Sequence, residues 1–231
     1  MVAVSGRALA FDRRTCFYPG GGGQPSDDGT VRIAGGEALE IVSADADADE
    51  IVWHLTRSEL SPVLVGHTAT LAVNRMRRIV LTRYHTVLHV LNTIALRDYD
   101  GWITGVQIGV DRSRIDFKLD RLSAALCAEL EAKVNAVLAS NHAVKAYDVS
   151  EDEFRARGDL LRTLDARPPV RDGRVRVVEI EGFDAQACGG THVDTTAGVG
   201  RFTIVHTENK GKINKRLYVR LDDPGSPAEG R

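Results

Sequence analysis

The sequence has few cysteines, no long apolar run and no excess of charge of either sign. Three cysteines in 231 residues are too few for a disulfide framework, and such sparse use is typical of a reducing compartment. The N-terminus shows no charged-then-apolar signal pattern, and no apolar run approaches the length of a membrane span. We therefore expect a cytoplasmic protein without a membrane partner.

The formal net charge of −2 excludes a global positive field, so a nucleic-acid partner would have to be met by a local basic patch. An apolar fraction of 43% and a charged fraction of 27% are ordinary for a globular protein. A chain of this length can bury a substantial core and can hold one large or two small domains. Its oligomeric state is left open.

Two distant stretches together suggest a metal site. His85 and His89 are four positions apart in a segment with helical periodicity, which places both imidazoles on one face. Cys188 and His192 have the same separation, but the glycine pair between them favours a tight turn. Each pair alone is often a surface or core feature without a metal. Together they form a ligand set suited to Zn²⁺, and we predict one zinc ion per chain held by His85, His89, Cys188 and His192.

Short alternating apolar segments with turn residues between them occupy residues 1–73 and predict a small N-terminal domain resembling a β-barrel or sandwich. Four consecutive glycines, Gly20 to Gly23, permit positive φ there. A phosphate cradle is excluded because no Gly-Lys-Ser/Thr follows. Aromatic and proline neighbours favour an ordered loop near the substrate site over a flexible surface loop.

From Asn74 the pattern becomes helical through about Tyr99 and carries both histidines. A second helix is expected from a cap at Asp120 to about Ser140. Strands and helices do not alternate strictly, so residues 74–221 predict a two-layer α+β domain with an antiparallel sheet. The Pro/Gly/Ser-rich residues 222–231 predict a disordered tail.

The joint pattern resembles the editing domain of alanyl-tRNA synthetases and, more closely, the freestanding AlaX trans-editing proteins of medium length. The resemblance spans about residues 5–221. It rests on the Tyr-Pro-Gly-Gly-Gly-Gly-Gln-Pro run at 18–25, the two histidine-containing pairs, Gln107 with Gly109, and residues 115–117. Ile108 and Val110 stand where the family often has Lys and Ser, which leaves the choice between serine and glycine open.

The resemblance implies a zinc-dependent hydrolase that deacylates mischarged Ser-tRNA(Ala), and possibly Gly-tRNA(Ala). A pocket built for alanine discriminates against such near-isosteres only about 10–200-fold, so a second site must remove the wrong ester. The zinc ion would either lower the pKa of a bound water toward about 7 or orient the amino acid.

The same resemblance suggests roles for further residues. Gln107 and Thr30 are candidate catalytic contacts to the substrate, and the loop formed by Gly20, Gly21, Gly22, Gly23 and Gln24 would approach the tRNA 3′ end. Phosphates would be met by basic side chains, so binding should weaken with salt, although an ordinary solvated face is the alternative for the arginines at the start of the helix. These basic side chains are Arg75, Arg77, Arg78, Lys210, Lys212 and Lys215.

Two alternatives remain at this point. The threonyl-tRNA synthetase editing domain shares both histidine-containing patterns and would act on Ser-tRNA(Thr), although the Gly20–Gln24 loop favours the alanine system. A non-catalytic, zinc-stabilised RNA-binding module would instead have a closed four-ligand site whose loss unfolds the domain.

Overall fold

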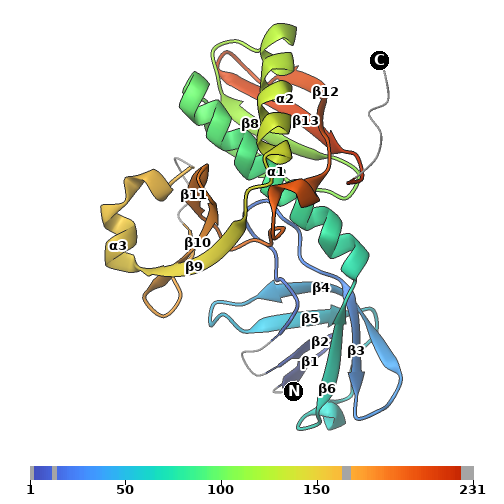
Figure 1. The fold of residues 1–231 in the computed structure, drawn as a ribbon. Helices are drawn as coiled ribbons and strands as arrows, with labels where there is room; N and C mark the ends of the chain where they lie inside the picture. Colours follow the sequence, from blue (N-terminus) through green and yellow to red (C-terminus); the bar gives the residue numbers. More distant parts are fainter. Residues whose placement is uncertain (1–2, 12–14, 163–167, 225–231) are drawn as a thin grey trace. The chain divides into compact units, whose positions relative to one another are not determined.

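The computed structural model describes residues 3–11, 15–162 and 168–224 (Figure 1). The chain divides into two compact units, Met1–Val80 and Leu81–Arg231, and the division falls inside the long helix α1 (Arg75–Tyr99). Helices and antiparallel sheets occur together, so the predicted α+β class is confirmed. Within the described ranges, no helix combines the length and the apolar composition needed to cross a membrane.

A single sheet forms the first unit, and its core includes Leu9, Phe17 and Ile41. A short 3₁₀ turn, η1 (Pro62–Leu64), precedes the last strand. The strands are β1 (Ala3–Ser5), β2 (Ala8–Ala10), β3 (Gly29–Ile33), β4 (Ala38–Ala46), β5 (Val52–Thr56) and β6 (Ala69–Val73).

The predicted barrel-like closure of this unit is not confirmed. The strand order is β1-β2-β5-β4-β3-β6, and every pair is antiparallel. In the described part of the chain β1 and β6 are therefore the two ends of an open sheet. Closure depends on strand tilt and register, which the alternation of apolar residues does not encode.

Helix α1 is the centre of the second unit. It begins after Asn74, whose side-chain oxygen accepts a hydrogen bond from the N–H of Arg77 at 3.3 Å, as an N-cap residue does. Every residue from Arg83 to Ala95 is buried. At its end Asp100 adopts a positive φ of 52°, which stops the helix in a left-handed turn. The predicted helix through Tyr99 is confirmed.

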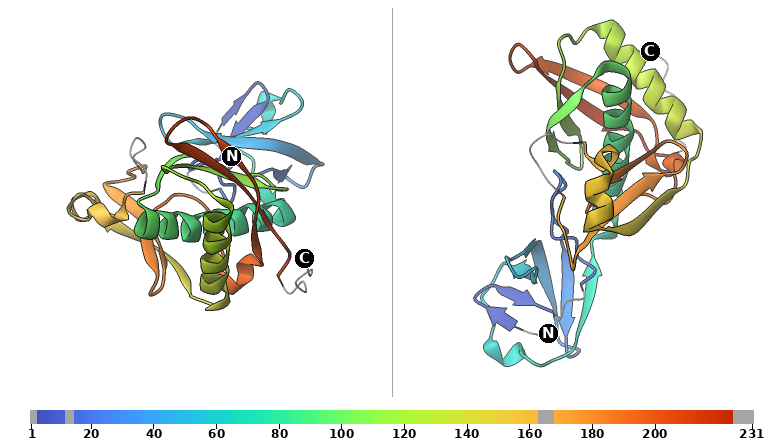
Figure 2. Two further views of the ribbon diagram at one scale, coloured as in Figure 1. Left: turned by 90° about the horizontal axis from the view of Figure 1, so that it is seen from above. Right: turned by 90° about the vertical axis from the view of Figure 1, so that its left-hand side faces the viewer.

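The rest of the second unit forms two antiparallel sheets, of order β11-β10-β9 and β12-β13-β8-β7. Figure 2 shows α1 and α2 on one side of the four-stranded sheet, where Ile115, Phe117 and Leu217 are fully buried. The elements are β7 (Trp102–Gln107), β8 (Ser113–Lys118), α2 (Ala124–Ala139), β9 (Val144–Ser150), α3 (Glu151–Ala156), η2 (Gly158–Leu160), β10 (Arg174–Ile180), β11 (Asp184–Ala187), η3 (Thr196–Val199), β12 (Phe202–Asn209) and β13 (Asn214–Leu221).

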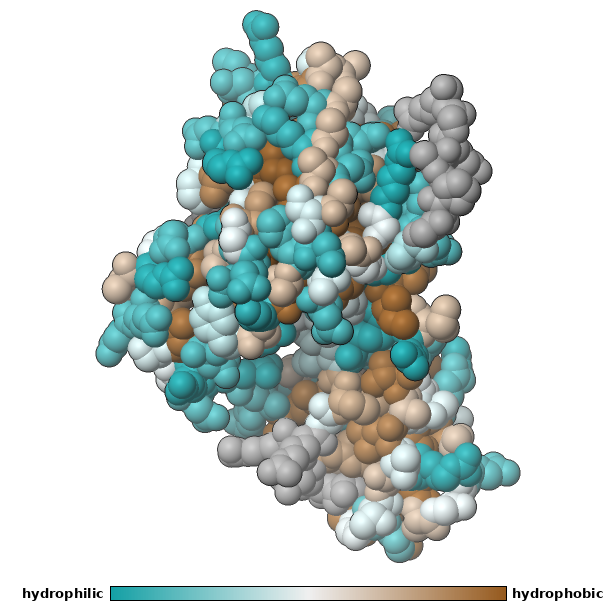
Figure 3. Space-filling view, in the orientation of Figure 1, coloured by the Kyte–Doolittle hydropathy of each residue, from teal (hydrophilic) through white to brown (hydrophobic). Residues whose placement is uncertain are grey.

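The three-stranded sheet has its own small core, which includes Val149, Leu160 and Val175. Helix α3 buries none of its residues, and the surface around it in Figure 3 is mostly hydrophilic. It begins at Ser150, whose hydroxyl accepts from the N–H of Glu153 at 3.1 Å. This helix therefore stays at the surface, started by its cap and packed on the small core through the partly buried Phe154.

The predicted tail at residues 222–231 is only partly described. Asp223 forms an ion pair with Arg83 at 3.0 Å, and the Asp222 carbonyl accepts a hydrogen bond from the same guanidinium. These first residues are thus attached to α1. Residues 225–231 lie outside the described residues, so the prediction of disorder stays a prediction there.

Candidate metal centre

The two distant histidine-containing stretches meet in the second unit. His85 and His89 project from the buried part of α1, and Cys188 and His192 come from the loop after β11. The four ligand atoms all lie within 4.8 Å of one another. Cys188 Sγ is 3.3 Å from His85 Nε2 and 3.5 Å from His192 Nε2. Zinc bonds of about 2.0–2.3 Å in a tetrahedron place ligand atoms about 3.3–3.7 Å apart, so the two separations from the thiol sulfur fit such an ion.

Burial keeps the three imidazoles neutral. It lowers the pKa of His85 to about 4, with a smaller contribution from the Arg176 charge. Burial likewise holds the pKa of His89 and of His192 well below the usual value. A neutral imidazole keeps a lone pair for a metal. In the part of the chain that is described, His89 Nδ1 is buried without a hydrogen-bond partner, as expected where a bound ion or water completes a site.

The thiol has the opposite tendency, because burial raises the pKa of Cys188. The metal-free thiol therefore holds its proton at neutral pH. A metal binds the thiolate, so binding must release this proton. The donor set fits Zn²⁺, with one soft sulfur and borderline imidazole nitrogens.

Thr86 fixes the tautomer of His192. The Thr86 hydroxyl donates its one proton to the carbonyl of Thr82 at 3.0 Å. It therefore accepts hydrogen bonds from His192 Nδ1 at 3.1 Å and from the N–H of Val193 at 3.2 Å. His192 thus carries its proton on Nδ1, and the lone pair of Nε2 is left for the centre of the cluster.

The glycine pair and an arginine shape the loop that carries the thiol. A Cβ on Gly190 would lie 2.0 Å from His85 Cε1 and 2.3 Å from His85 Nδ1, so only glycine allows this approach. Arg176 Nη1 donates to the carbonyls of Cys188 and Gly190 at 2.7 and 2.9 Å. The loop is therefore held from β10, and its backbone lies directly against the His85 ring.

A buried polar network continues from the cluster along α1 and β11. Gln186, two residues before Cys188, donates to the Asp184 carboxylate at 2.7 Å and exchanges hydrogen bonds with Asn92. Arg162 pairs with the same carboxylate. The network fixes β11 to the helix one turn beyond His89, and so it fixes where the thiol begins its loop.

Thr86, Arg176 and Gln186 were not predicted from the sequence as part of the site. Thr86 follows His85 directly, and its position inside the helical motif is the only signal that the sequence offers for it. Gln186 shares a strand face with Cys188 by alternation. The role of Arg176 depends on the pairing of β10 with β11, which no sequence pattern specified.

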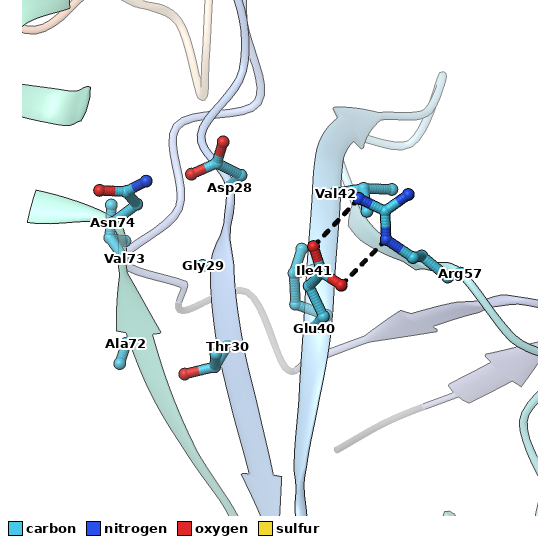
Figure 4. Close-up of a pocket in the computed structure, with 10 residues that line it drawn as sticks. All are labelled: Asp28, Gly29, Thr30, Glu40, Ile41, Val42, Arg57, Ala72, Val73 and Asn74. Atoms are coloured by element: carbon cyan, nitrogen blue, oxygen red, sulfur yellow. Dashed lines mark hydrogen bonds and ion pairs between the residues drawn. The ribbon is translucent and has the colours of Figure 1, made fainter.

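Gln107 and Thr30 lie in different units. Gln107 is exposed at the end of β7, and its side-chain oxygen accepts from Arg114 Nε at 2.8 Å. Thr30 on β3 lines an open pocket of the first unit, between β6 and the ion pair that Glu40 on β4 forms with Arg57, the residue after β5 (Figure 4). Their predicted contacts to substrate stay predictions.

The glycine-rich loop is an ordered hairpin in the first unit. Gly21 and Gln24 exchange two backbone hydrogen bonds of 3.0 Å, and Gly22 and Gly23 between them have φ of 57° and 81°. A two-residue turn of this kind requires positive φ at both positions. The Tyr18 hydroxyl donates to the Gly21 carbonyl at 2.9 Å. The loop is thus fixed by its own turn, and its predicted proximity to a substrate stays a prediction.

The predicted phosphate-binding residues differ in their surroundings. Arg78 forms an ion pair with the buried Asp27 and donates to the Cys16 carbonyl. Lys215 is buried, and its ammonium group donates to two carbonyls of its own turn at 3.2 and 2.9 Å. Arg75 and Lys212 are exposed. Lys210 is exposed too and forms an ion pair with Glu208. Arg78 and Lys215 therefore have structural partners already.

Comparison with known proteins shows similarity over nearly the whole chain. The family model "Threonyl and Alanyl tRNA synthetase second additional domain" matches residues 175–218, which include Cys188 and His192. An "Alanyl-tRNA editing protein AlaX-M" of Methanosarcina mazei is 36% identical over 227 residues, covering 96% of this chain and 90% of its own. A protein of that name from Saccharolobus solfataricus is 28% identical over 221 residues, covering 96% and 92%. An "Alanine--tRNA ligase" of Methanosphaera stadtmanae is 34% identical over 220 residues, but these make up only 24% of the ligase.

Proposed function

Because the chain belongs to the AlaX-M family of alanyl-tRNA editing proteins, we propose that it is a zinc-dependent deacylase of mischarged tRNA(Ala), with Ser-tRNA(Ala) as the main substrate and Gly-tRNA(Ala) as a second. The reaction is hydrolysis of the ester between the amino acid and the tRNA 3′ end. Water adds to the ester carbonyl, and the products are the free amino acid and a tRNA with a free terminal hydroxyl.

The observation that supports this proposal most strongly is the meeting of His85, His89, Cys188 and His192 within 4.8 Å. Two segments from opposite ends of the second unit supply these residues. A site built in this way from a helix and a distant loop is typical of a functional centre, whereas a structural finger closes a short loop.

Different residues of this chain would bind the metal, orient its ligands and contact the substrate. His85, His89, Cys188 and His192 would hold the ion, three of them at a time so that one position stays open, and the ion would supply Lewis-acid polarisation of the ester carbonyl or of the attacking water. Thr86 orients the His192 ring through Nδ1, and Arg176 holds the carbonyls on both sides of Gly189. Gln107, exposed on β7, is available to contact the substrate.

The test is deacylation of Ser-tRNA(Ala), Gly-tRNA(Ala) and Ala-tRNA(Ala) by the wild type and by Cys188→Ala. We expect the wild type to clear the serine ester and to spare the alanine ester, and we expect the variant to lose the activity. If the zinc-loaded wild type clears no mischarged tRNA(Ala), the proposal is wrong.

A second candidate substrate is Ser-tRNA(Thr), which is favoured by the reference to threonyl-tRNA synthetase in the matching family model. The AlaX-M relatives match over nearly the whole chain, and they favour the alanine system. Parallel assays with Ser-tRNA(Thr) separate the two substrates, because an alanine-system enzyme should leave that ester largely intact.

A thermal melt before and after chelation tests the other alternative, a zinc-stabilised RNA-binding module. Structural zinc contributes about 10–16 kcal/mol in small zinc-folded peptides, so its removal would unfold such a module. In this chain the second unit has an extensive core of its own around α1. We therefore expect the fold to survive chelation while deacylation is lost.

A further inference from the structure

One face of the four-stranded sheet carries no helix in the described structure. On β13, the buried residues Leu217 and Val219 alternate with Arg216, Tyr218 and Arg220. Because Leu217 and Val219 are buried, the first set faces the side of the sheet that α1 and α2 cover (Figure 2). The second set therefore lies on the opposite side, which we call the open face.

The open face is rich in positive charge. The register of β8 with β13 pairs Arg114 with Tyr218 and Asp116 with Arg216, so these side chains share that face. On the paired strands its basic side chains are Arg114, Lys118, Arg216 and Arg220, and its carboxylates are Asp116 and Glu208; the β7–β8 loop beside it adds Arg112 and Asp111. This local excess of positive charge occurs in a chain whose net charge is −2.

Asp116 arranges two of these guanidinium groups. Its carboxylate is buried and accepts from Arg216 Nε at 2.7 Å, from Arg216 Nη2 at 2.8 Å and from Arg114 Nη1 at 3.1 Å. Arg114 also donates to Gln107 at the end of the edge strand β7. Both guanidinium groups are therefore held in place beside a substrate contact predicted from the sequence. Because these guanidinium groups are already paired with a buried carboxylate, the phosphate contacts fall chiefly to the exposed Arg112, Lys118 and Arg220.

Aromatic rings lie next to the basic side chains of the open face. The Arg112 guanidinium lies 5.0 Å from the Tyr218 ring centroid, and the His206 ring lies 5.5 Å from the same ring. Arginines interleaved with aromatic rings on an exposed sheet are typical of surfaces that bind RNA by phosphate contacts and base stacking.

We propose that the open face of the β12-β13-β8-β7 sheet binds the sugar–phosphate backbone of the tRNA substrate. The identity of this RNA rests on the proposed function, whereas the location of the surface rests on the charges and rings described above. The assignment also moves the phosphate contacts away from Arg78 and Lys215, which have internal partners, to the exposed Arg112, Lys118 and Arg220.

The test measures the affinity for uncharged tRNA(Ala) by fluorescence anisotropy at several salt concentrations. The test variant is Arg112→Gln, Lys118→Gln, Arg220→Gln, because these three side chains are exposed and lie outside the Asp116 network. We expect Kd to rise about 10–100-fold, and the slope of log K against log salt to shrink by about 2–3.

The matched control carries the same change in charge elsewhere in the second unit: Arg155→Gln, Arg157→Gln, Arg174→Gln, all away from the four-stranded sheet. Its Kd for tRNA(Ala) should be within about twofold of the wild-type value, since charges far from the bound RNA are screened at moderate salt. An unchanged Kd and salt slope in the test variant would overturn the proposal, and so would equal weakening in both variants or no tRNA binding by the wild type.

Deacylation kinetics keep this inference separate from the proposed function. If the open face holds the tRNA, the test variant should raise KM for Ser-tRNA(Ala) and leave kcat nearly unchanged. If the wild type binds tRNA through this face but clears no ester, the proposed function fails and the surface stands. If the wild type clears the ester and the test variant keeps its KM, the surface fails and the function stands.

Discussion

The loop that carries Cys188 and His192 can pack against the His85 ring only because residue 190 is glycine. A Cβ at this position would overlap the His85 ring, and the ring cannot yield without leaving the cluster. We predict that Gly190→Ala weakens zinc binding by about 10–100-fold or more, the range seen when the support of a metal ligand is lost. Competition with a chromophoric chelator measures this affinity.

Gly189 provides the matched control. A Cβ there would have Pro169 Cγ as its nearest neighbour, at an ordinary 3.8 Å. Gly189→Ala should therefore bind zinc as the wild type does. Equal zinc affinities of the two alanine variants would show that the approach to His85 is not what limits the site.

Thr86 supports the second prediction at this scale. Thr86→Val keeps the shape of the side chain but removes the acceptor for His192 Nδ1 and for the Val193 N–H. The ring then loses its preferred tautomer, and we expect zinc affinity to fall about 10–100-fold. Thr86→Ser restores the hydroxyl and should restore most of the affinity. Wild-type affinity in the valine variant would contradict the assigned hydrogen bonds.

The four candidate metal ligands could be predicted from the sequence, but the residues that hold them in place could not. Residue type and spacing were enough to single out His85, His89, Cys188 and His192, because a metal site needs donors of a definite chemistry. The support from Thr86 and Arg176 was missed because hydroxyl and guanidinium groups have many uses. Their roles appear only when the loop after β11 is placed against α1.

At the scale of the element, helix ends were predictable where a local cap defines them. Asn74 starts α1 and Ser150 starts α3 as short-range hydrogen bonding requires. The cap predicted at Asp120 was wrong, since α2 begins after Ser123, whose hydroxyl accepts from the N–H of Leu126 at 3.1 Å. Both residue types cap helices well, so the sequence could not choose between them.

The glycine-rich hairpin is held to the start of α1 through Asp27. This carboxylate accepts from the N–H of Tyr18 at 2.5 Å and pairs with Arg78, and it is only 1% exposed. Removing one partner of a buried pair leaves the other uncompensated. We predict that Asp27→Asn lowers the free energy of unfolding of the first unit by about 2–4 kcal/mol, a little below the range for fully buried pairs, because Arg78 is partly exposed.

Urea unfolding followed by Trp53 fluorescence, in a Trp102→Phe background, reports on this unit alone, because each unit contains one of the two tryptophans. The control is Glu40→Gln, which removes the exposed pair with Arg57 in the same sheet. Exposed pairs contribute little, so this variant should unfold nearly as the wild type does. Equal effects of the two variants would contradict a special role for Asp27.

At the scale of the whole molecule, the fold class was predictable and the closure of the first unit was not. Helical and alternating periodicities change near Asn74, and this change indicated an α+β architecture. Whether β1 meets β6 depends on the register of pairs far apart in sequence. For the same reason the composition, with its net charge of −2, gave no sign that β8 and β13 would bring their arginines to one face.

The two units each bury neutral histidine, which makes acid stability a property of the molecule as a whole. In the first unit His54 is fully buried. Its ring nitrogens bond Thr15 Oγ1 at 2.8 Å and the Leu9 carbonyl at 3.2 Å. The centroids of the Phe11 and Phe17 rings lie 4.9 and 5.0 Å from the centroid of the His54 ring. Burial lowers the pKa of His54. Just below about pH 6.5 the imidazole is therefore protonated in the unfolded state but stays neutral in the folded state.

The sign of the pH effect follows from this difference. Above about pH 6.5 both states hold His54 neutral, and its contribution to stability is fully present. As the pH falls below that value, only the unfolded state takes up the proton, so the free energy of unfolding decreases until the folded pKa is reached. We predict that the first unit, followed by Trp53 fluorescence in the Trp102→Phe background, loses stability as the pH falls below about 6.5. His54→Gln should be less stable at pH 7 yet lose less on acidification, because it removes the titrating ring. A parallel loss with and without His54 would assign the acid sensitivity to other groups.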